Sequence, residues 1–166
     1  DFLPHLTDLK FLGGEPFLID TYYDIWEKVV EVNQKIKIHI TTNGTILNQR
    51  VKDLLAKLNV GIVISLDSID KNEFESIRVG AKFERVIENF EYFHNLTKQK
   101  KTYLSIAACA MSNNWKGIPN LINFANEKNV PIHFNVVWNP GHLSMRFLKY
   151  DELETIEAHF KANLYN

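Results

Sequence analysis

The sequence contains a single cysteine, Cys109, among its 166 residues. One cysteine cannot form an intramolecular disulfide, and it cannot by itself supply the ligand set of a zinc or iron–sulfur centre. It lies in the apolar run 107–110, where cysteine most often behaves as a small buried hydrophobe. His39, His133 and His142 do not have the spacing of a metal motif. We therefore predict no metal ligand in this chain, and we name no catalytic residue.

Neither a charge excess nor a long apolar run is present. The 19 lysines and arginines balance 20 acidic residues, so the chain has no long-range attraction for a polyanion, and we predict no nucleic-acid partner. No segment approaches the roughly 20 apolar residues that cross a bilayer, and no signal peptide opens the chain. We predict a cytoplasmic protein with no membrane association.

The length and the 45% hydrophobic content favour one domain over residues 1–166, with no linker or low-complexity segment. The chain begins at Asp1, directly before a predicted strand, which suggests a piece of a longer protein. Apolar patterns predict strands at 8–12, 36–40, 60–66, 102–110 and 131–138. Helical patterns follow each strand, at 17–32, 51–58, 83–96, 115–128 and 151–164, with a further short helix opened by Asp70. The order predicts an α/β fold with a parallel sheet that is open or wraps only part of the way round.

A short polar segment, called a tip, follows each of the first three predicted strands. The first tip is Gly13-Gly14-Glu15-Pro16. Two glycines allow positive φ angles and leave backbone carbonyls accessible to a ligand, while Glu15 adds a carboxylate. An ammonium group would suit this tip. The alternative is a tight turn into a helix, with Glu15 favoured by the helix dipole.

The second and third tips offer hydrogen-bonding groups. Asn43 follows the second strand and could bind ribose hydroxyls, although a helix cap and turn explain it equally well. Ser65 and Asp67 are two residues apart on the third predicted strand, hence on one face, where they could hold a polar substituent. Arg78 suits either a helix C-terminus or a planar fork for a ligand carboxylate. Ammonium and carboxylate sites together describe an amino-acid ligand.

Four segments resemble, in their order along the chain, the core motifs of radical SAM enzymes, particularly the SPASM/twitch-type group. They are residues 12–16, 41–44 and 65–68, and Arg78 together with the segment 83–89. The resemblance runs from about Leu9 to Pro140. It implies a partial (β/α)6 TIM-like barrel whose first strand and cluster loop precede Asp1. It also implies S-adenosylmethionine (SAM) and a [4Fe-4S] cluster as cofactors. The cofactor-binding residues would be Gly13, Gly14, Glu15, Asn43, Ser65, Asp67, Arg78 and Val137.

Within this resemblance, the glycine–glutamate tip takes the methionine amino group, Asn43 or Ser65 meets ribose or carboxylate oxygens, Arg78 takes the carboxylate, and Val137 borders the adenine. The family holds its cluster on Cys-x3-Cys-x2-Cys, which this chain lacks. The full protein would generate a 5′-deoxyadenosyl radical that abstracts a substrate hydrogen, whereas this chain alone would be inactive. The substrate is unknown, with a peptide or protein as one option.

Two alternatives remain open at this point. The chain could be a degenerate, non-catalytic barrel that binds a peptide or partner, in which case no cluster cysteines would occur upstream. It could also be an unrelated barrel enzyme acting on a phosphorylated sugar, because the strand ends of such folds host many chemistries. The latter requires a phosphate-binding nest, and neither Gly13-Gly14 nor Gly44 has the glycine spacing of one.

Overall fold

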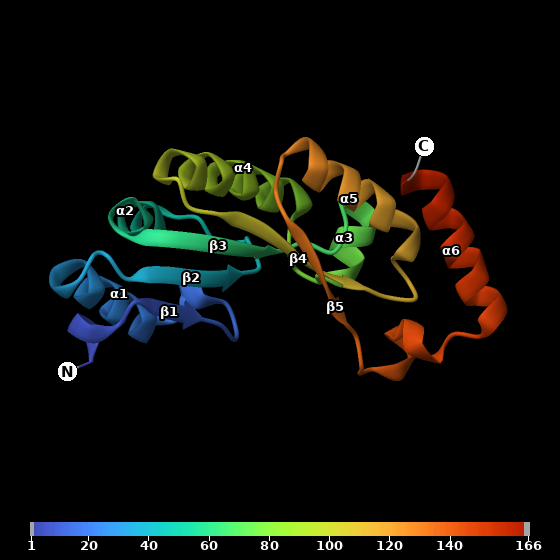
Figure 1. Cartoon of the computed structure of the whole chain (residues 1–166), viewed down its shortest axis with the longest axis horizontal. Coiled ribbons are helices and arrows are strands. Elements are labelled where there is room, and N and C mark those ends of the chain that lie inside the picture. The colour runs from blue at the N-terminus through green and yellow to red at the C-terminus, as the bar shows by residue number, and fades with distance from the viewer. Residues whose placement is uncertain (1, 165–166) are drawn as a thin grey trace. The chain divides into compact units, whose positions relative to one another are not determined.

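The computed structural model describes residues 2–164 and is drawn in Figure 1. Its strands are β1 (Asp8–Phe11), β2 (Lys37–Thr42), β3 (Asn59–Ser65), β4 (Leu104–Ala110) and β5 (Ile132–Val136). Its helices are α1 (Asp20–Val32), α2 (Gln49–Lys57), α3 (Lys71–Ile77), α4 (Phe83–Lys100), α5 (Ile118–Glu127) and α6 (Tyr150–Leu164). The strands form a sheet in the order β1-β2-β3-β4-β5, and every described pairing is parallel. The predicted α/β class is confirmed.

The chain divides into two compact units. The first comprises Asp1–Ser65 and Lys82–Ser105, and the second comprises Leu66–Ala81 and Ile106–Asn166. The first unit therefore holds β1 to β3 with α1, α2 and α4. The second holds α3, most of β4, β5, α5 and α6.

The core of the first unit lies on one face of its strands. Ile38 and Ile40 of β2 are fully buried, and in register with them on β3 so are Val60 and Ile62. On β2 the intervening residues, such as His39, are more exposed, whereas on β3 the intervening Gly61 is buried. This alternation follows from the two-residue period of a strand, and α4 packs against β3.

Aromatic side chains join the helices of the first unit to its sheet. Trp26 of α1 is fully buried and meets Phe11 of β1 edge-to-face, with 5.1 Å between the ring centroids. Phe17 stacks on Phe93 of α4 at 6.3 Å. Aromatic pairs in these geometries stabilise beyond their buried area. They hold the segment after β1 in place, and this segment carries the first predicted tip.

In the second unit, Asp70 caps α3 by accepting a hydrogen bond from the Glu73 N–H at 2.8 Å, as the sequence predicted. The helix ends at Ile77 with Arg78 as its C-cap residue, and Gly80 follows with φ of 88°. In α6, His159 contacts Trp115 edge-to-face at 5.2 Å and the Lys116 carbonyl at 3.0 Å. These contacts attach α6 to the start of α5.

Most predicted element boundaries differ from the structure by one or more residues, and three of these differences lie near the predicted site or the helices beside it. The helix predicted at 17–32 begins at Asp20, because Pro16–Leu18 forms a separate 3-10 turn. The helix predicted at 115–128 likewise begins with a 3-10 turn, and α5 starts at Ile118. The third strand ends at Ser65, so Asp67 is not on it, and strand alternation does not place the two side chains on one face. No helix within residues 2–164 is long and apolar enough to span a membrane.

Candidate functional site

The loop after β1 has the backbone conformation that its glycines predicted. Gly13 has φ of 86° and Gly14 has φ of 56°, a region that glycine enters without a steric penalty. A Cβ built on Gly13 would meet nothing within 4 Å, so this glycine faces open space. The neighbouring Leu12 carbonyl accepts a hydrogen bond from the Tyr22 hydroxyl at 3.1 Å. The loop is thus held from α1 while its glycine tip stays accessible.

Glu15 is the central residue of the first unit's predicted site. Only 7% of it is exposed. Its Oε1 accepts hydrogen bonds from the Thr42 hydroxyl at 2.7 Å and the Phe17 N–H at 3.2 Å, and its Oε2 accepts from the Asn43 N–H at 2.7 Å. A carboxylate has about four acceptor positions, so one position on Oε2 remains available. Glu15 therefore joins the loops after β1 and β2 and keeps one acceptor for a donor.

The side-chain oxygen of Asn43 stabilises the loop after β2. Its Oδ1 accepts hydrogen bonds from the Thr45 N–H at 2.9 Å and the Thr45 hydroxyl at 2.7 Å, which is the turn geometry that asparagine favours. Its Nδ2 donates no hydrogen bond to any described residue. The structure thus shows the predicted turn role of Asn43 and leaves its amide donors available.

Two residues that support this loop were not assigned a site role from the sequence. Thr42, only 1% exposed, donates to Glu15 and accepts from the Gly44 N–H at 3.1 Å. Asn89 of α4 donates to the Gly44 carbonyl at 2.7 Å and is 7% exposed. Asn89 could have been found, because it is a lone polar residue on the apolar face of a helix pattern. Such a residue needs a buried partner.

Ser65, the last predicted residue in the first unit, ends β3 and is half-buried. Its hydroxyl forms no hydrogen bond within the described part of the chain. The first unit thus brings Glu15 and Asn43 into direct contact and places Gly13 and Gly14 next to Glu15 in sequence. The structure shows no such contact for Ser65.

The second unit holds Asp67, Arg78 and Val137. Arg78 forms an ion pair with Asp67 at 2.7 Å, and the Cys109 N–H donates to the other Asp67 oxygen at 2.7 Å. The Asp67 carboxylate is therefore occupied by protein groups, and only 4% of Asp67 is exposed. The Nε of Arg78 is buried without a hydrogen-bond partner, so the guanidinium retains a donor. Val137 is half-buried, just beyond the end of β5.

Asn114 holds the loop that carries Asp67. It is 1% exposed, and its Nδ2 donates to the Asp67 carbonyl at 3.2 Å and to the Cys109 carbonyl at 2.9 Å. Burial, followed by the negative charge of Asp67, raises the pKa of the Cys109 thiol, while Arg78 acts in the opposite direction. A thiol with a raised pKa is a poor metal ligand, since metals bind the thiolate. No group of three or more potential metal ligands occurs among the described residues.

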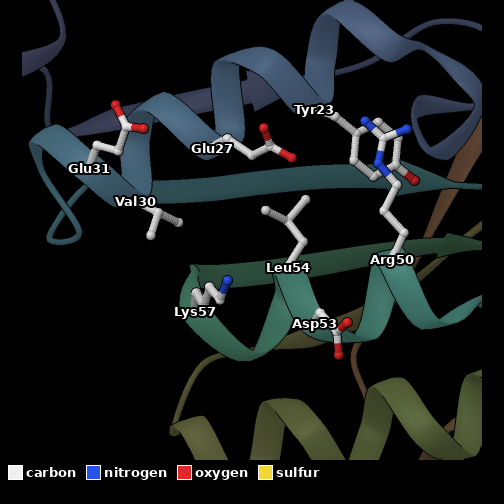
Figure 2. Close-up of a pocket in the computed structure, with 8 residues that line it drawn as sticks. All are labelled: Tyr23, Glu27, Val30, Glu31, Arg50, Asp53, Leu54 and Lys57. Atoms are coloured by element: carbon white, nitrogen blue, oxygen red, sulfur yellow. The ribbon is translucent and has the colours of Figure 1, made fainter.

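A separate cavity of about 350 Å³ lies between α1 and α2 (Figure 2). At one end the Arg50 guanidinium stacks on the Tyr23 ring, 3.8 Å from its centroid, and forms an ion pair with Asp20 at 3.0 Å. Glu27 and Leu54 extend into the space between the helices. None of the predicted site residues lines this cavity.

The comparisons with known proteins identify the family. The family model for the radical SAM superfamily matches residues 4–111, which is more than half of the chain. This segment contains the loops after β1 and β2 as well as Asp67 and Arg78. The chain belongs to the radical SAM superfamily. The family prediction is confirmed, and SAM and a [4Fe-4S] cluster are the cofactors that this superfamily uses.

Curated relatives support the assignment. The chain is 26% identical over 161 residues to a GTP 3′,8-cyclase from Staphylococcus epidermidis, covering 93% of this chain and 46% of the relative. It is 28% identical over 154 residues to molybdenum cofactor biosynthesis protein 1 from Dictyostelium discoideum, covering 89% and 24%. The chain thus spans about half or less of the length of these relatives.

Solved structures show the same fold. A structure of anSMEcpe with bound AdoMet aligns with a TM-score of 0.67 and 21% identity, covering 99% of this chain and 47% of the other. Streptococcus suis SuiB aligns with a TM-score of 0.65 and 20% identity, covering 95% and 36%. The chain therefore has the fold of part of a TIM-like radical SAM barrel, as the sequence predicted.

Proposed function

We propose that this chain supplies SAM-binding residues to a radical SAM enzyme. In such enzymes, SAM and a reduced [4Fe-4S] cluster together supply a 5′-deoxyadenosyl radical that abstracts a hydrogen atom from the substrate. The observation that carries the proposal is the Glu15 carboxylate, which is buried, anchored by three hydrogen bonds and left with one acceptor position. A buried carboxylate needs this last position filled by a strong donor.

The methionine ammonium of SAM fits that requirement. An ammonium carries three donors, and the loop offers it the open Oε2 position of Glu15 together with backbone carbonyls near the accessible tip at Gly13. The glycines permit close approach because no Cβ stands in the way. Since three bonds already fix the carboxylate, binding needs no reorientation of Glu15, which keeps the cost in conformational entropy low.

Other groups of SAM would use the donors that the structure leaves available. We assign the Asn43 Nδ2 group, in the first unit, to oxygens of the ribose or the carboxylate, with Ser65 as the alternative. In the second unit, the guanidinium of Arg78 retains its Nε donor and is assigned to the methionine carboxylate. Asp67 positions Arg78 through their ion pair and does not contact ligand in this proposal. Val137 is assigned to the adenine.

The cluster does not fit the residues of this chain. A [4Fe-4S] cluster of this superfamily is held by three cysteines, and Cys109 is the single cysteine here, with a pKa raised by burial. The proposal therefore requires that the encoded protein supply the three cysteines from outside these 166 residues. The residues described here would hold and orient SAM and exclude water, and no proton transfer is assigned to them.

The test uses the full-length protein encoded by the gene, reconstituted anaerobically with iron and sulfide. We expect SAM to bind and, after reduction, to yield 5′-deoxyadenosine by liquid chromatography and mass spectrometry. Glu15→Gln should weaken SAM binding by about tenfold, because the ammonium loses its anionic partner. Glu27→Gln, an exposed substitution on α1, is the matched control. Equal SAM affinity in all three proteins would refute the assignment of Glu15.

The same assay separates catalysis from the non-catalytic alternative. SAM binding without 5′-deoxyadenosine, in a protein that lacks the three cysteines, would favour a binding module. For the substrate, the relatives point to two chemical classes. The Staphylococcus epidermidis relative is named GTP 3′,8-cyclase, whereas the solved structures include SuiB bound to precursor peptide SuiA. We propose a peptide substrate, and parallel assays with peptides and with GTP decide between the two classes.

A further inference from the structure

A second cluster of polar side chains lies in the first unit, at the amino-terminal ends of its strands. His39 of β2 bridges Asp8 of β1 and Tyr103, the residue preceding β4. The His39 Nε2 lies 3.0 Å from an Asp8 oxygen, and its Nδ1 lies 2.8 Å from the Tyr103 hydroxyl. The loops after β1 and β2, which carry the SAM proposal, are at the opposite ends of the same strands. The two sites in this unit are therefore distinct.

Gly61 of β3 makes room for this cluster. A Cβ at this position would come within 2.2 Å of the Tyr103 ring, so no other residue leaves the ring where it lies. The φ of Gly61 is outside the left-handed region, which means that space and not backbone conformation requires the glycine. A glycine in the middle of a strand costs stability. The glycine therefore lies at the strand position that the Tyr103 ring covers.

The groups of this cluster differ in protonation state. Burial raises the pKa of Tyr103, so the phenol is protonated at neutral pH. The hydrogen bond from His39 lowers the pKa of Asp8, whose carboxylate is therefore ionised. The His39 Nε2 faces the Asp8 carboxylate, which is an acceptor, and its Nδ1 faces the Tyr103 hydroxyl, so both ring nitrogens have a polar partner. The Asp8 carboxylate is thus engaged by His39, and the nearby charge of Lys37 also helps to lower its pKa.

The cluster lines a cavity of about 480 Å³. Lys37 and Lys101 line it too, and neither forms an ion pair with a described residue. Asn59 and Thr102 add an amide and a hydroxyl, and the Thr102 hydroxyl is buried without a hydrogen-bond partner. Two cations and two neutral donor groups thus surround one carboxylate that is already engaged. The side chains that line the cavity therefore carry a net positive charge and offer more hydrogen-bond donors than acceptors.

We propose that this cavity binds the phosphate group of a small metabolite. A phosphate presents at least three acceptor oxygens, which matches two ammonium groups together with the amide and hydroxyl of Asn59 and Thr102. A carboxylate would leave part of this donor set unused. The volume exceeds that of phosphate alone, and the partly exposed Tyr103 ring offers a surface for the remainder of the ligand. This site is independent of the SAM proposal.

The test measures binding of inorganic phosphate and of a nucleoside 5′-monophosphate to the chain by calorimetry. The His39 imidazole resonances are followed by NMR in parallel. We expect saturable binding with a shift of the His39 signals, and about tenfold weaker binding in Lys37→Gln/Lys101→Gln. Lys57→Gln, an exposed lysine of α2 outside this cavity, should bind as the parent does. Tighter binding of the nucleotide identifies a phosphate ester as the ligand, and equal binding identifies free phosphate.

Two results would overturn the proposal. One is the absence of saturable binding of either compound to the folded parent chain. The other is binding that is unchanged in the double lysine variant or that leaves the His39 signals in place. The lysine substitutions change exposed side chains, so circular dichroism should show that the variants fold as the parent does, and loss of binding then reports on the cavity.

Discussion

The side-chain amide of Asn89, in α4, donates a 2.7 Å hydrogen bond to the backbone carbonyl of Gly44, in the loop after β2. The two residues are 45 positions apart in the sequence. The bond holds the loop whose other end, at Asn43, donates to the Glu15 carboxylate. The proposed ammonium site therefore depends on a helix that contributes no residue to it.

Replacing Asn89 by alanine should destabilise the protein by about 1 to 3 kcal/mol, because a buried carbonyl then loses its partner. The measurement is urea unfolding followed by circular dichroism. Asn95→Ala on the same helix is the control, since Asn95 is exposed, and it should stay within about 0.5 kcal/mol of the parent. Equal effects of the two substitutions would show that the bond to Gly44 contributes nothing to stability.

Gly44→Ala should destabilise the protein more than Gly80→Ala. Both glycines have positive φ, 74° and 88°, so both substitutions carry a conformational penalty of about 1 kcal/mol. A Cβ on Gly44 would also come within 2.7 Å of the Ile64 side chain, whereas one on Gly80 meets nothing within 4 Å. Thermal unfolding of both variants gives the comparison. A Gly80 variant as unstable as the Gly44 variant would contradict the steric argument.

The thiol of Cys109 should titrate above its ordinary pKa of 9.0, because burial and the Asp67 carboxylate disfavour the thiolate. The rate of alkylation by iodoacetamide, measured against pH, should have its midpoint above that of the urea-unfolded chain. The folded state keeps the thiol proton to a higher pH than the unfolded state does. Ionisation of Cys109 should therefore lower the free energy of unfolding as pH rises through 9. Arg78→Gln should move the midpoint further upward, because the arginine charge favours the thiolate. A folded midpoint at or below the unfolded one would refute this explanation.

Most of the fold was predictable from local patterns. Alternating isoleucines marked β2 because a strand with one buried face repeats every two residues, and the buried run of β3 was equally clear. Errors fell at element ends. The start of the first helix was misplaced because the predicted helical face continued through the 3-10 turn at Pro16–Leu18. Apolar periodicity does not distinguish a single 3-10 turn from the first turn of an α-helix.

The site residues named from the sequence stay a prediction, and their contacts within the chain were not predicted. Glu15 and Asn43 were expected to face a ligand, and the contacts that the structure shows for them are hydrogen bonds within the chain. Arg78 was assigned to a carboxylate, and the carboxylate that it meets in the structure is that of Asp67. The hydrogen-bonding and ion-pairing partners of these residues lie elsewhere in the sequence. A motif considered alone therefore does not identify the partners.

The sequence by itself determined the order of the strands and helices, the glycine conformations at the loop tips and the family. These properties depend on neighbouring residues or on motif order. Only the tertiary structure decided that Glu15 bonds Thr42 and that His39 stands between Asp8 and Tyr103, 64 positions away. Such pairs depend on strand register, because a shift by one residue would turn His39 to the opposite face of the sheet.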